Sequence, residues 1–326
     1  MTLYRDIIKR SLQITWRYKF LWIFGFFATI AGTSSDIGLI LNSINDLSNQ
    51  SDYSGNIQMI LTIKMWVMAF LNVLNVPFTA TLMLLGLLLA IIAIAWLIFT
   101  SMAGIVGAAA VIEQGKRQTF EGVWKIGAMN FLPVFGVNLA SKIIILLLLF
   151  LSIPLLQSGV IAADAPNAAL FIFYFTLVFL PSAFIISVIT KYAMAYIVIR
   201  KKPFPEAVLS AIKLFKDNWI MSVEMAFVVF GVHILFAIGY AISSRIITFA
   251  LQLISELGYA ISPTSLWHIG ITSLALIIFA LIILVIESML AVFEYVAWTK
   301  LFLKTEEGKV SSKIMRLAGS LPKFFK

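Results

Sequence analysis

Six residues with ionisable side chains lie inside long apolar stretches of this sequence, where a charge is costly to place. They are Lys142, Lys191, Glu224, His233, Glu287 and Glu294. Ionisable groups in such surroundings usually face protein or water. They pair with one another, or they line a path for protons, ions or small solutes. Ion pairing and movement of a small charged solute are therefore the two kinds of chemistry open to these residues.

Depth along the expected helices sorts five of these residues into two layers. At about 1.5 Å per residue, Lys191, Glu224 and Glu294 lie roughly 8–14 Å from the expected cytoplasmic ends, and Lys142 and Glu287 near 18–20 Å. Lys191 and Glu294 each precede a tyrosine and occupy matching places in repeated units, so we expect an ion pair between them. Structural pairing is favoured over a polar pathway. Glu287 and Glu294 are seven residues apart, so they share a helix face that is also compatible with a pathway.

Motifs for catalysis and metal binding are missing from the sequence. There is no cysteine, and neither His233 nor His268 belongs to a cluster with metal-ligand spacing. Gly115-Lys116 lacks the upstream glycine and the following Ser or Thr of a phosphate loop, and no Gly-x-Ser-x-Gly motif occurs. We predict no enzyme activity, no cofactor and no metal. We expect His233 to be satisfied inside the helix bundle and His268 to lie at the external interface.

The composition is that of an integral membrane protein. Of its 326 residues, 61% are hydrophobic and only 12% are charged. Apolar runs exceed the roughly 20 residues that a helix needs to cross a bilayer. The alternating ten-residue segments of a membrane β-barrel are absent, so the fold class is predicted to be all-α, an integral membrane helical bundle.

The basic residues gather at every second expected loop. All of the 24 Lys and Arg residues except Lys64, Lys142 and Arg245 fall in four clusters along the chain. This placement predicts six transmembrane helices with both termini cytoplasmic, and it puts the clusters against anionic lipid headgroups. The division of the charge among spans argues against a nucleic-acid partner. The lipid-surface candidates are Arg10, Arg17, Lys116, Arg117, Arg200, Lys201 and Lys202.

One unit is predicted to occur three times within a single transmembrane domain at 1–303, at about residues 1–112, 113–199 and 200–303. Each unit begins with an amphipathic helix at the membrane interface and continues into two spans. The polar face consists of Asp6, Arg10, Gln13 and Arg17 in the first unit, and of Glu206, Ser210, Lys213 and Asp217 in the third. Every unit begins on the cytoplasmic side, so the repeats are predicted to be parallel.

The expected elements have the following bounds. Surface helices are expected at 3–19 and 119–130, and spans at about 20–31, 78–112, 131–153, 168–199, 219–242 and 268–303. External interfacial helices are expected at 57–74, favoured there over a further span, and within 243–266. Pro181 is expected to kink the fourth span. The tail at 304–326 is expected to form a basic amphipathic cytoplasmic helix.

A basic surface helix leads into the membrane through Trp16-Arg17-Tyr18-Lys19-Phe20-Leu21-Trp22. This pattern resembles a set of prokaryotic multi-pass proteins similar to the membrane domain that precedes some glycerophosphodiester phosphodiesterases. The phosphodiesterase of those enzymes is a separate soluble domain, which this chain, ending at Lys326, is expected to lack. The resemblance therefore implies a module of the prokaryotic cytoplasmic membrane and transfers no catalytic residue.

These observations lead to a functional prediction with two alternatives. The prediction is a non-enzymatic membrane module that binds or organises a partner protein or anionic lipid. The first alternative is a transporter or channel for a small solute or ion that uses the buried Lys/Glu pairs. The second, a lipid-modifying enzyme, has the least support because no nucleophile, metal site or phosphate site is evident.

Overall fold

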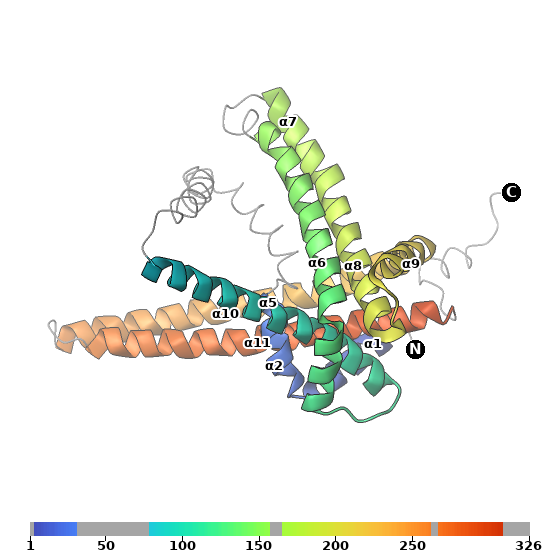
Figure 1. Ribbon diagram of the computed structural model, residues 1–326. Coiled ribbons are helices and arrows are strands. Elements are labelled where there is room, and N and C mark those ends of the chain that lie inside the picture. The colour runs from blue at the N-terminus through green and yellow to red at the C-terminus, as the bar shows by residue number, and fades with distance from the viewer. Residues whose placement is uncertain (1–2, 31–77, 157–164, 262–266, 309–326) are drawn as a thin grey trace, which may run out of the picture.

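The computed structural model describes residues 3–30, 78–156, 165–261 and 267–308, and all regular structure within these ranges is helical (Figure 1). The elements are α1 (Leu3–Arg17), α2 (Leu21–Ile30), α5 (Phe78–Glu113), α6 (Phe120–Leu156), α7 (Ala165–Phe173), the π-helix η3 (Tyr174–Phe179), α8 (Leu180–Arg200), α9 (Phe204–Asp217), α10 (Trp219–Ile261) and α11 (Trp267–Glu306). Five segments are long and apolar enough to cross a membrane: Leu84–Glu113, Phe120–Leu155, Pro166–Arg200, Trp219–Leu253 and Ile277–Glu306. The prediction of an all-α integral membrane protein is confirmed.

The first expected span lies only partly within the described ranges. Its described part is α2, a helix of 10 residues, which at about 1.5 Å per residue is half of what a bilayer core requires. The expected external helix at 57–74 lies outside the described residues, as does the tail from residue 309 on. Six spans therefore remain a prediction, while the expected span at 78–112 agrees with α5 to within one residue.

Two expected helix breaks are wrong. The surface helix at 119–130 and the span that follows it form one helix, α6. The Asn130 amide donates to the Ile126 carbonyl at 2.6 Å, which keeps this side chain on its own helix. In the predicted third unit, by contrast, Asn218 leaves helical geometry, with φ −134°, and separates α9 from α10.

The second wrong break was expected near residue 243. The span expected at 219–242 and the interfacial helix expected after it form one helix of 43 residues, α10. Ser243 and Ser244 donate their hydroxyls to the carbonyls of Gly239 and Ala241 on the same helix. Both hydroxyl groups are thus hydrogen-bonded within the helix, so the helix continues past them.

The irregularity expected at Pro181 takes the form of a π-helix. The six residues of η3, Tyr174–Phe179, lie directly before the turn that contains this proline. Proline has no backbone N–H, so the regular α-helical hydrogen bonding cannot continue through this turn. The wider π turns absorb that gap while α7, η3 and α8 remain one helical rod (Figure 1).

Figure 1 shows two long hairpins that leave a common base in different directions. One hairpin is α6 with α7–α8, and the other is α10 with α11. α5 contacts α6, α8 and α11, so it joins the two hairpins at the base. The fit against α6 is close, because a Cβ added to Gly127 would lie 2.1 Å from the Thr100 carbonyl oxygen.

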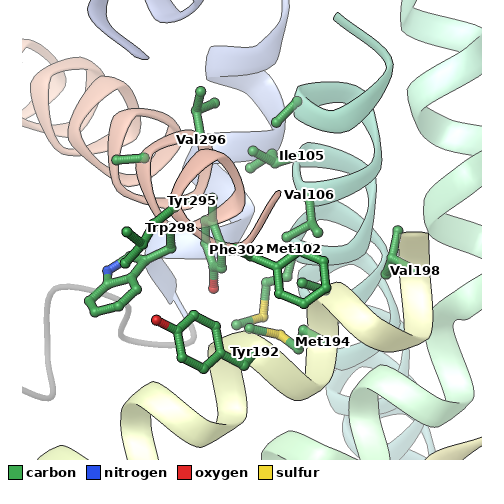
Figure 2. Packing of buried hydrophobic residues seen from close by; sticks show 14 of the residues in the cluster. Met102, Ile105, Val106, Tyr192, Met194, Val198, Tyr295, Val296, Trp298 and Phe302 are labelled. Carbon is green, nitrogen blue, oxygen red and sulfur yellow. The ribbon is translucent and has the colours of Figure 1, made fainter. Parts of the chain in front are cut away.

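The core lies at this base, not along the hairpins. α11 is buried from Leu290 to Phe302, whereas Ile277 and Leu281, nearer its start, are more than half exposed. Figure 2 shows the packing of this core, where Tyr192 of α8 lies against Trp298 and Phe302 of α11. The exposed leucines and isoleucines of the hairpins form the surface expected to contact lipid.

Candidate functional site

The predicted ion pair between Lys191 and Glu294 is present in the structure. Lys191 Nζ lies 3.2 Å from Glu294 Oε1, and the two side chains are only 14% and 5% exposed. Lys191 also donates to Ser187 Oγ at 3.0 Å and lies 5.4 Å from the centre of a Trp298 ring. A carboxylate, a hydroxyl and an indole face therefore hold one ammonium group away from water.

His233 adds a third ionisable group to this pair. Its Nε2 lies 3.5 Å from Glu294 Oε2, the oxygen that is not nearest to Lys191. Its Nδ1 lies 2.9 Å from the Val229 carbonyl oxygen. Nε2 is buried and has no hydrogen-bond partner in the described part of the chain, so the contact with Glu294 is close but is not a hydrogen bond. The expectation of a satisfied histidine holds at one ring nitrogen only.

We call Lys191, Glu294 and His233 the intramembrane cluster. Its three members come from α8, α11 and α10, and all lie within segments that can cross a membrane. A single carboxylate thus faces an ammonium on one side and an imidazole on the other. Such an arrangement can hold helices together, and it can bind and release a proton.

The other predicted intramembrane residues do not join this cluster. Glu224 accepts a hydrogen bond from the Tyr4 hydroxyl, which ties α10 to α1. Lys142 and Glu287 are half-buried on α6 and α11 and do not form an ion pair with each other. Similar depth did not bring this second pair together, because both residues lie outside the buried core at the base, along hairpins that diverge (Figure 1).

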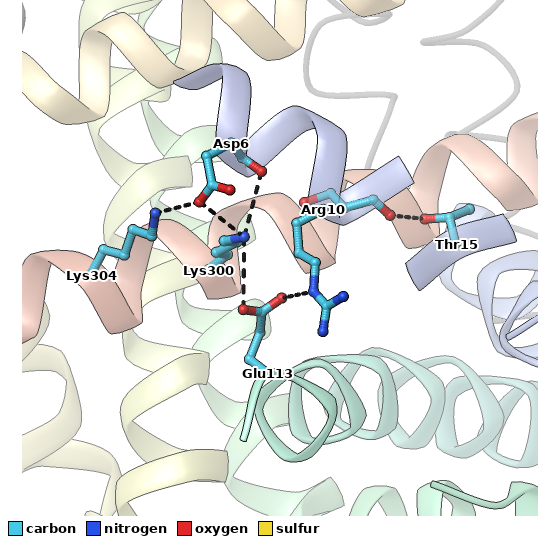
Figure 3. A network of polar contacts seen from close by, with 7 residues as sticks. Asp6, Arg10, Thr15, Glu113, Lys300 and Lys304 are labelled. Atoms are coloured by element: carbon cyan, nitrogen blue, oxygen red, sulfur yellow. Dashed lines mark hydrogen bonds and ion pairs between the residues drawn. The ribbon is translucent and has the colours of Figure 1, made fainter. Parts of the chain in front are cut away.

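A second set of charges, which we call the basal network, joins α1 to the ends of α5 and α11 (Figure 3). Lys300, with a side chain only 6% exposed, lies 3.3 Å from Asp6 Oδ2 and 3.8 Å from Glu113 Oε2. Lys304 Nζ lies 2.6 Å from Asp6 Oδ2, and Arg10 Nε lies 3.2 Å from Glu113 Oε1. The hydrogen bond from Lys304 is the main cause that lowers the pKa of Asp6, and partial burial opposes it.

Sequence reasoning missed the basal network. It assigned Asp6 and Arg10 to a lipid-facing polar surface and placed Lys300 in a terminal basic cluster. The spacing of the charged residues is the sequence signal that could have predicted the network. Asp6 and Arg10 are four residues apart, and so are Lys300 and Lys304. Two helices with charges at this spacing can face each other through one row of side chains.

Four of the seven lipid-surface candidates interact with their own chain. Arg10 contacts Glu113, and Arg200 forms a bidentate contact with Glu306 at 2.6–3.1 Å. Lys201 donates to Asn130 Oδ1 at 3.3 Å, and Lys202 donates to Ser210 Oγ at 2.8 Å. Arg17, Lys116 and Arg117 are exposed.

The apolar side of α1 also differs from its predicted role. An amphipathic helix at the membrane interface would turn its apolar side, with Ile7, Ile8, Leu12 and Trp16 opposite the polar face, to the membrane. The structure buries Ile7 completely, in the side of α1 that packs on α11. Leu12 and Trp16 remain 48% and 61% exposed. α1 therefore has one face in the protein core and another, carrying Trp16 and Arg17, that is open to its surroundings.

Within the described ranges, no group of three His, Cys, Asp or Glu residues has a geometry that could hold a metal ion. No protein-family model, curated protein or solved structure matches the chain. The resemblance to the membrane domain of glycerophosphodiester phosphodiesterases therefore stays a prediction.

Proposed function

We propose that this chain is a non-enzymatic membrane module that binds anionic lipid headgroups at its base, and that it organises lipid or a partner protein around its hairpins. The observation that supports this role is the open face of α1. Trp16 is 61% exposed there, and the neighbouring Arg17 is exposed as well. An indole and a guanidinium side by side suit the depth of the headgroups, where the ring lies among the upper chains and the cation meets phosphate.

The topology that we propose has six spans in three parallel units, with both termini cytoplasmic. It is supported by the order of elements, because α1 and α9 are short helices that each lead into an apolar helix, α2 and α10. The chain has no cysteine, so single cysteines can be introduced without background labelling. A cysteine at Arg117 should react with a membrane-impermeant maleimide only from the cytoplasmic side, and one at Asp52 only from outside. Labelling of both from the same side would contradict the topology.

Lipid binding can be tested by native mass spectrometry of protein extracted gently from its own membrane. We expect retained anionic phospholipid. Since each basic residue near an anionic surface contributes about 1 kcal/mol, replacing Arg17, Lys116 and Arg117 by Gln should weaken retention by about fivefold per charge.

The matched control is Arg245→Gln, which removes an exposed cation from α10, on the side proposed to be external. Equal lipid retention by the triple variant and the wild type would contradict the proposal. A stoichiometric protein adduct in place of lipid would identify the partner-binding form of the module.

A transporter or channel is the second candidate, and the intramembrane cluster favours it. A buried imidazole beside a buried carboxylate is the kind of group that proton-driven transporters use. Glu294→Gln in a transporter should abolish solute flux while the protein still folds, as judged by gel filtration. In the lipid-binding module, the same variant should lose stability, and its lipid retention should follow only the amount of folded protein.

A further inference from the structure

We propose that His233 and Glu294 form a proton-binding site, and that proton binding there weakens the link between the two hairpins. The ligand is a single proton, bound on His233 Nε2 against Glu294 Oε2. The proposal does not depend on lipid binding. It rests on the geometry of the intramembrane cluster and on the places of its three members in the fold.

The contact of Nδ1 determines which ring nitrogen of neutral His233 carries the hydrogen. His233 Nδ1 lies 2.9 Å from the Val229 carbonyl oxygen, and a carbonyl can only accept a hydrogen bond. Nδ1 therefore carries a hydrogen, and in the neutral ring Nε2 carries a lone pair. A carboxylate oxygen lies 3.5 Å from this nitrogen in a buried site, so with no hydrogen between the two atoms the contact is repulsive.

Proton uptake at Nε2 removes the repulsion between this nitrogen and the Glu294 carboxylate. Hydronium transfers its proton to the Nε2 lone pair and is released as water, so one N–H bond forms and no bond within the protein breaks. The cluster then changes from one positive charge on Lys191 and one negative charge on Glu294, a net charge of zero, to a net charge of +1. The repulsive contact becomes an ion pair between imidazolium and carboxylate.

Three helices, α8, α10 and α11, supply the charged groups around the His233 ring. α11 supplies Glu294 and, two turns earlier, Glu287, while α8 supplies Lys191. On α10 itself the nearest charge along the chain is Glu224, which accepts a hydrogen bond from Tyr4. Glu294 is the carboxylate in contact with the imidazole, so it is the group whose bonding changes.

Proton binding at His233 also affects the contact between the two hairpins. The Lys191–Glu294 pair connects α8 of one hairpin to α11 of the other, whereas His233 and Glu294 lie on α10 and α11 of the same hairpin. Proton binding moves the carboxylate from a partner in the other hairpin toward a partner in its own. The hairpins, which already diverge in Figure 1, then lose part of the contact that joins them at the base.

Nitrogen-15 NMR of histidine-labelled protein tests the site without altering it. The chain has two histidines, so the substitution His268→Gln leaves His233 as the only signal. As the pH is lowered, we expect Nδ1 to stay protonated and Nε2 to gain the proton. A neutral ring with its hydrogen on Nε2 would overturn the proposal, because Glu294 would then be satisfied without a further proton.

Distances between spin labels test the link between the hairpins. Cysteines at the exposed positions Leu147 of α6 and Ile282 of α11 report the separation of the hairpins in a chain that has no other cysteine. Acidification should lengthen this distance in the wild type, and the change in distance should be lost in His233→Gln. The variant His268→Gln is the matched control and should respond like the wild type. A distance that stays constant in the wild type, or changes equally in His233→Gln, would overturn the proposal.

Discussion

The intramembrane cluster and the basal network use the same kinds of groups in different surroundings. Each joins three helices through opposite charges. In the cluster, one carboxylate, 5% exposed, serves both Lys191 and His233. In the network, two carboxylates, 45% and 18% exposed, serve three cations. The cluster has no substitute for Glu294, whereas Lys300 keeps one carboxylate when the other is lost.

The contribution of an ion pair to stability therefore depends on how deeply the pair is buried. A buried charge has already lost its hydration, so removal of its partner leaves it uncompensated. A half-exposed charge is hydrated and screened by salt, and its pairing adds little. The buried cluster should therefore be sensitive to single substitutions, and the basal network should tolerate them.

The largest effect is expected from Glu294→Gln. This variant leaves Lys191 buried without a carboxylate and should lower the free energy of unfolding by about 3–5 kcal/mol. Unfolding of purified protein in detergent, followed by tryptophan fluorescence, measures it. Asp6→Asn is the matched control, because it also removes one carboxylate charge from an ion pair. Equal losses in the two variants would remove the distinction between the two regions.

The next effect concerns the charge swap Lys191→Glu with Glu294→Lys. Each single change places two like charges together and should reduce the yield of folded protein. The double variant should recover part of the loss, with a coupling energy on the order of 0.5–3 kcal/mol. Recovery will be incomplete because Ser187 and Trp298 are placed to hold an ammonium at the end of residue 191. A double variant no better than the worse single variant would contradict direct pairing.

A smaller effect is expected when both carboxylates of the basal network are removed. Asp6→Asn and Glu113→Gln should each be mild, because Lys300 retains one carboxylate in either variant. Together they leave Lys300 unpaired, and the loss should exceed the sum of the single losses by about 0.5–3 kcal/mol. The same unfolding measurement gives this difference. Strict additivity would mean that Lys300 does not depend on either carboxylate.

The smallest loss of stability is expected from the single substitution Asp6→Asn. Asp6→Asn should cost about 0.2–1 kcal/mol, and less at high salt, because the side chain is half-exposed. The pKa of Asp6 is lowered from 3.8 in the folded protein. Its contribution is therefore complete above about pH 4 and is lost as the pH falls through the lowered pKa. The difference in stability between wild type and Asp6→Asn should shrink on acidification, and a difference that grows would contradict this assignment.

Local sequence signals predicted much of the fold, and matching positions in the proposed repeats predicted one contact. The bounds of α5 and the partnership of Lys191 with Glu294 followed from apolar length and from repeat-equivalent positions. The joins within α6 and α10 did not follow, because Asn130, Ser243 and Ser244 satisfy their polar groups on the helix itself. A polar residue in the sequence marks a possible break, but only hydrogen bonding decides whether the helix ends.

The basal network shows why the rest of the site could not be predicted. Asp6 and Lys300 are 294 residues apart, and nothing local distinguishes a cation that faces a carboxylate from one that faces lipid. His233 was identified as buried, but its proximity to Glu294 depends on the register between α10 and α11. That register is set by packing along both helices.

The length of α10 has a consequence for the membrane itself. Its apolar segment Trp219–Leu253 has 35 residues, or about 52 Å at 1.5 Å per residue, against a hydrocarbon core of about 30 Å. A tilt of about 40°, the upper end of the usual range, would still leave roughly 10 Å of hydrophobic mismatch. Thickening of the surrounding bilayer relieves such a mismatch, and so does sorting into a thicker membrane. A neighbour with equally long spans would share the thickened lipid, so this chain could gather such proteins without a specific contact.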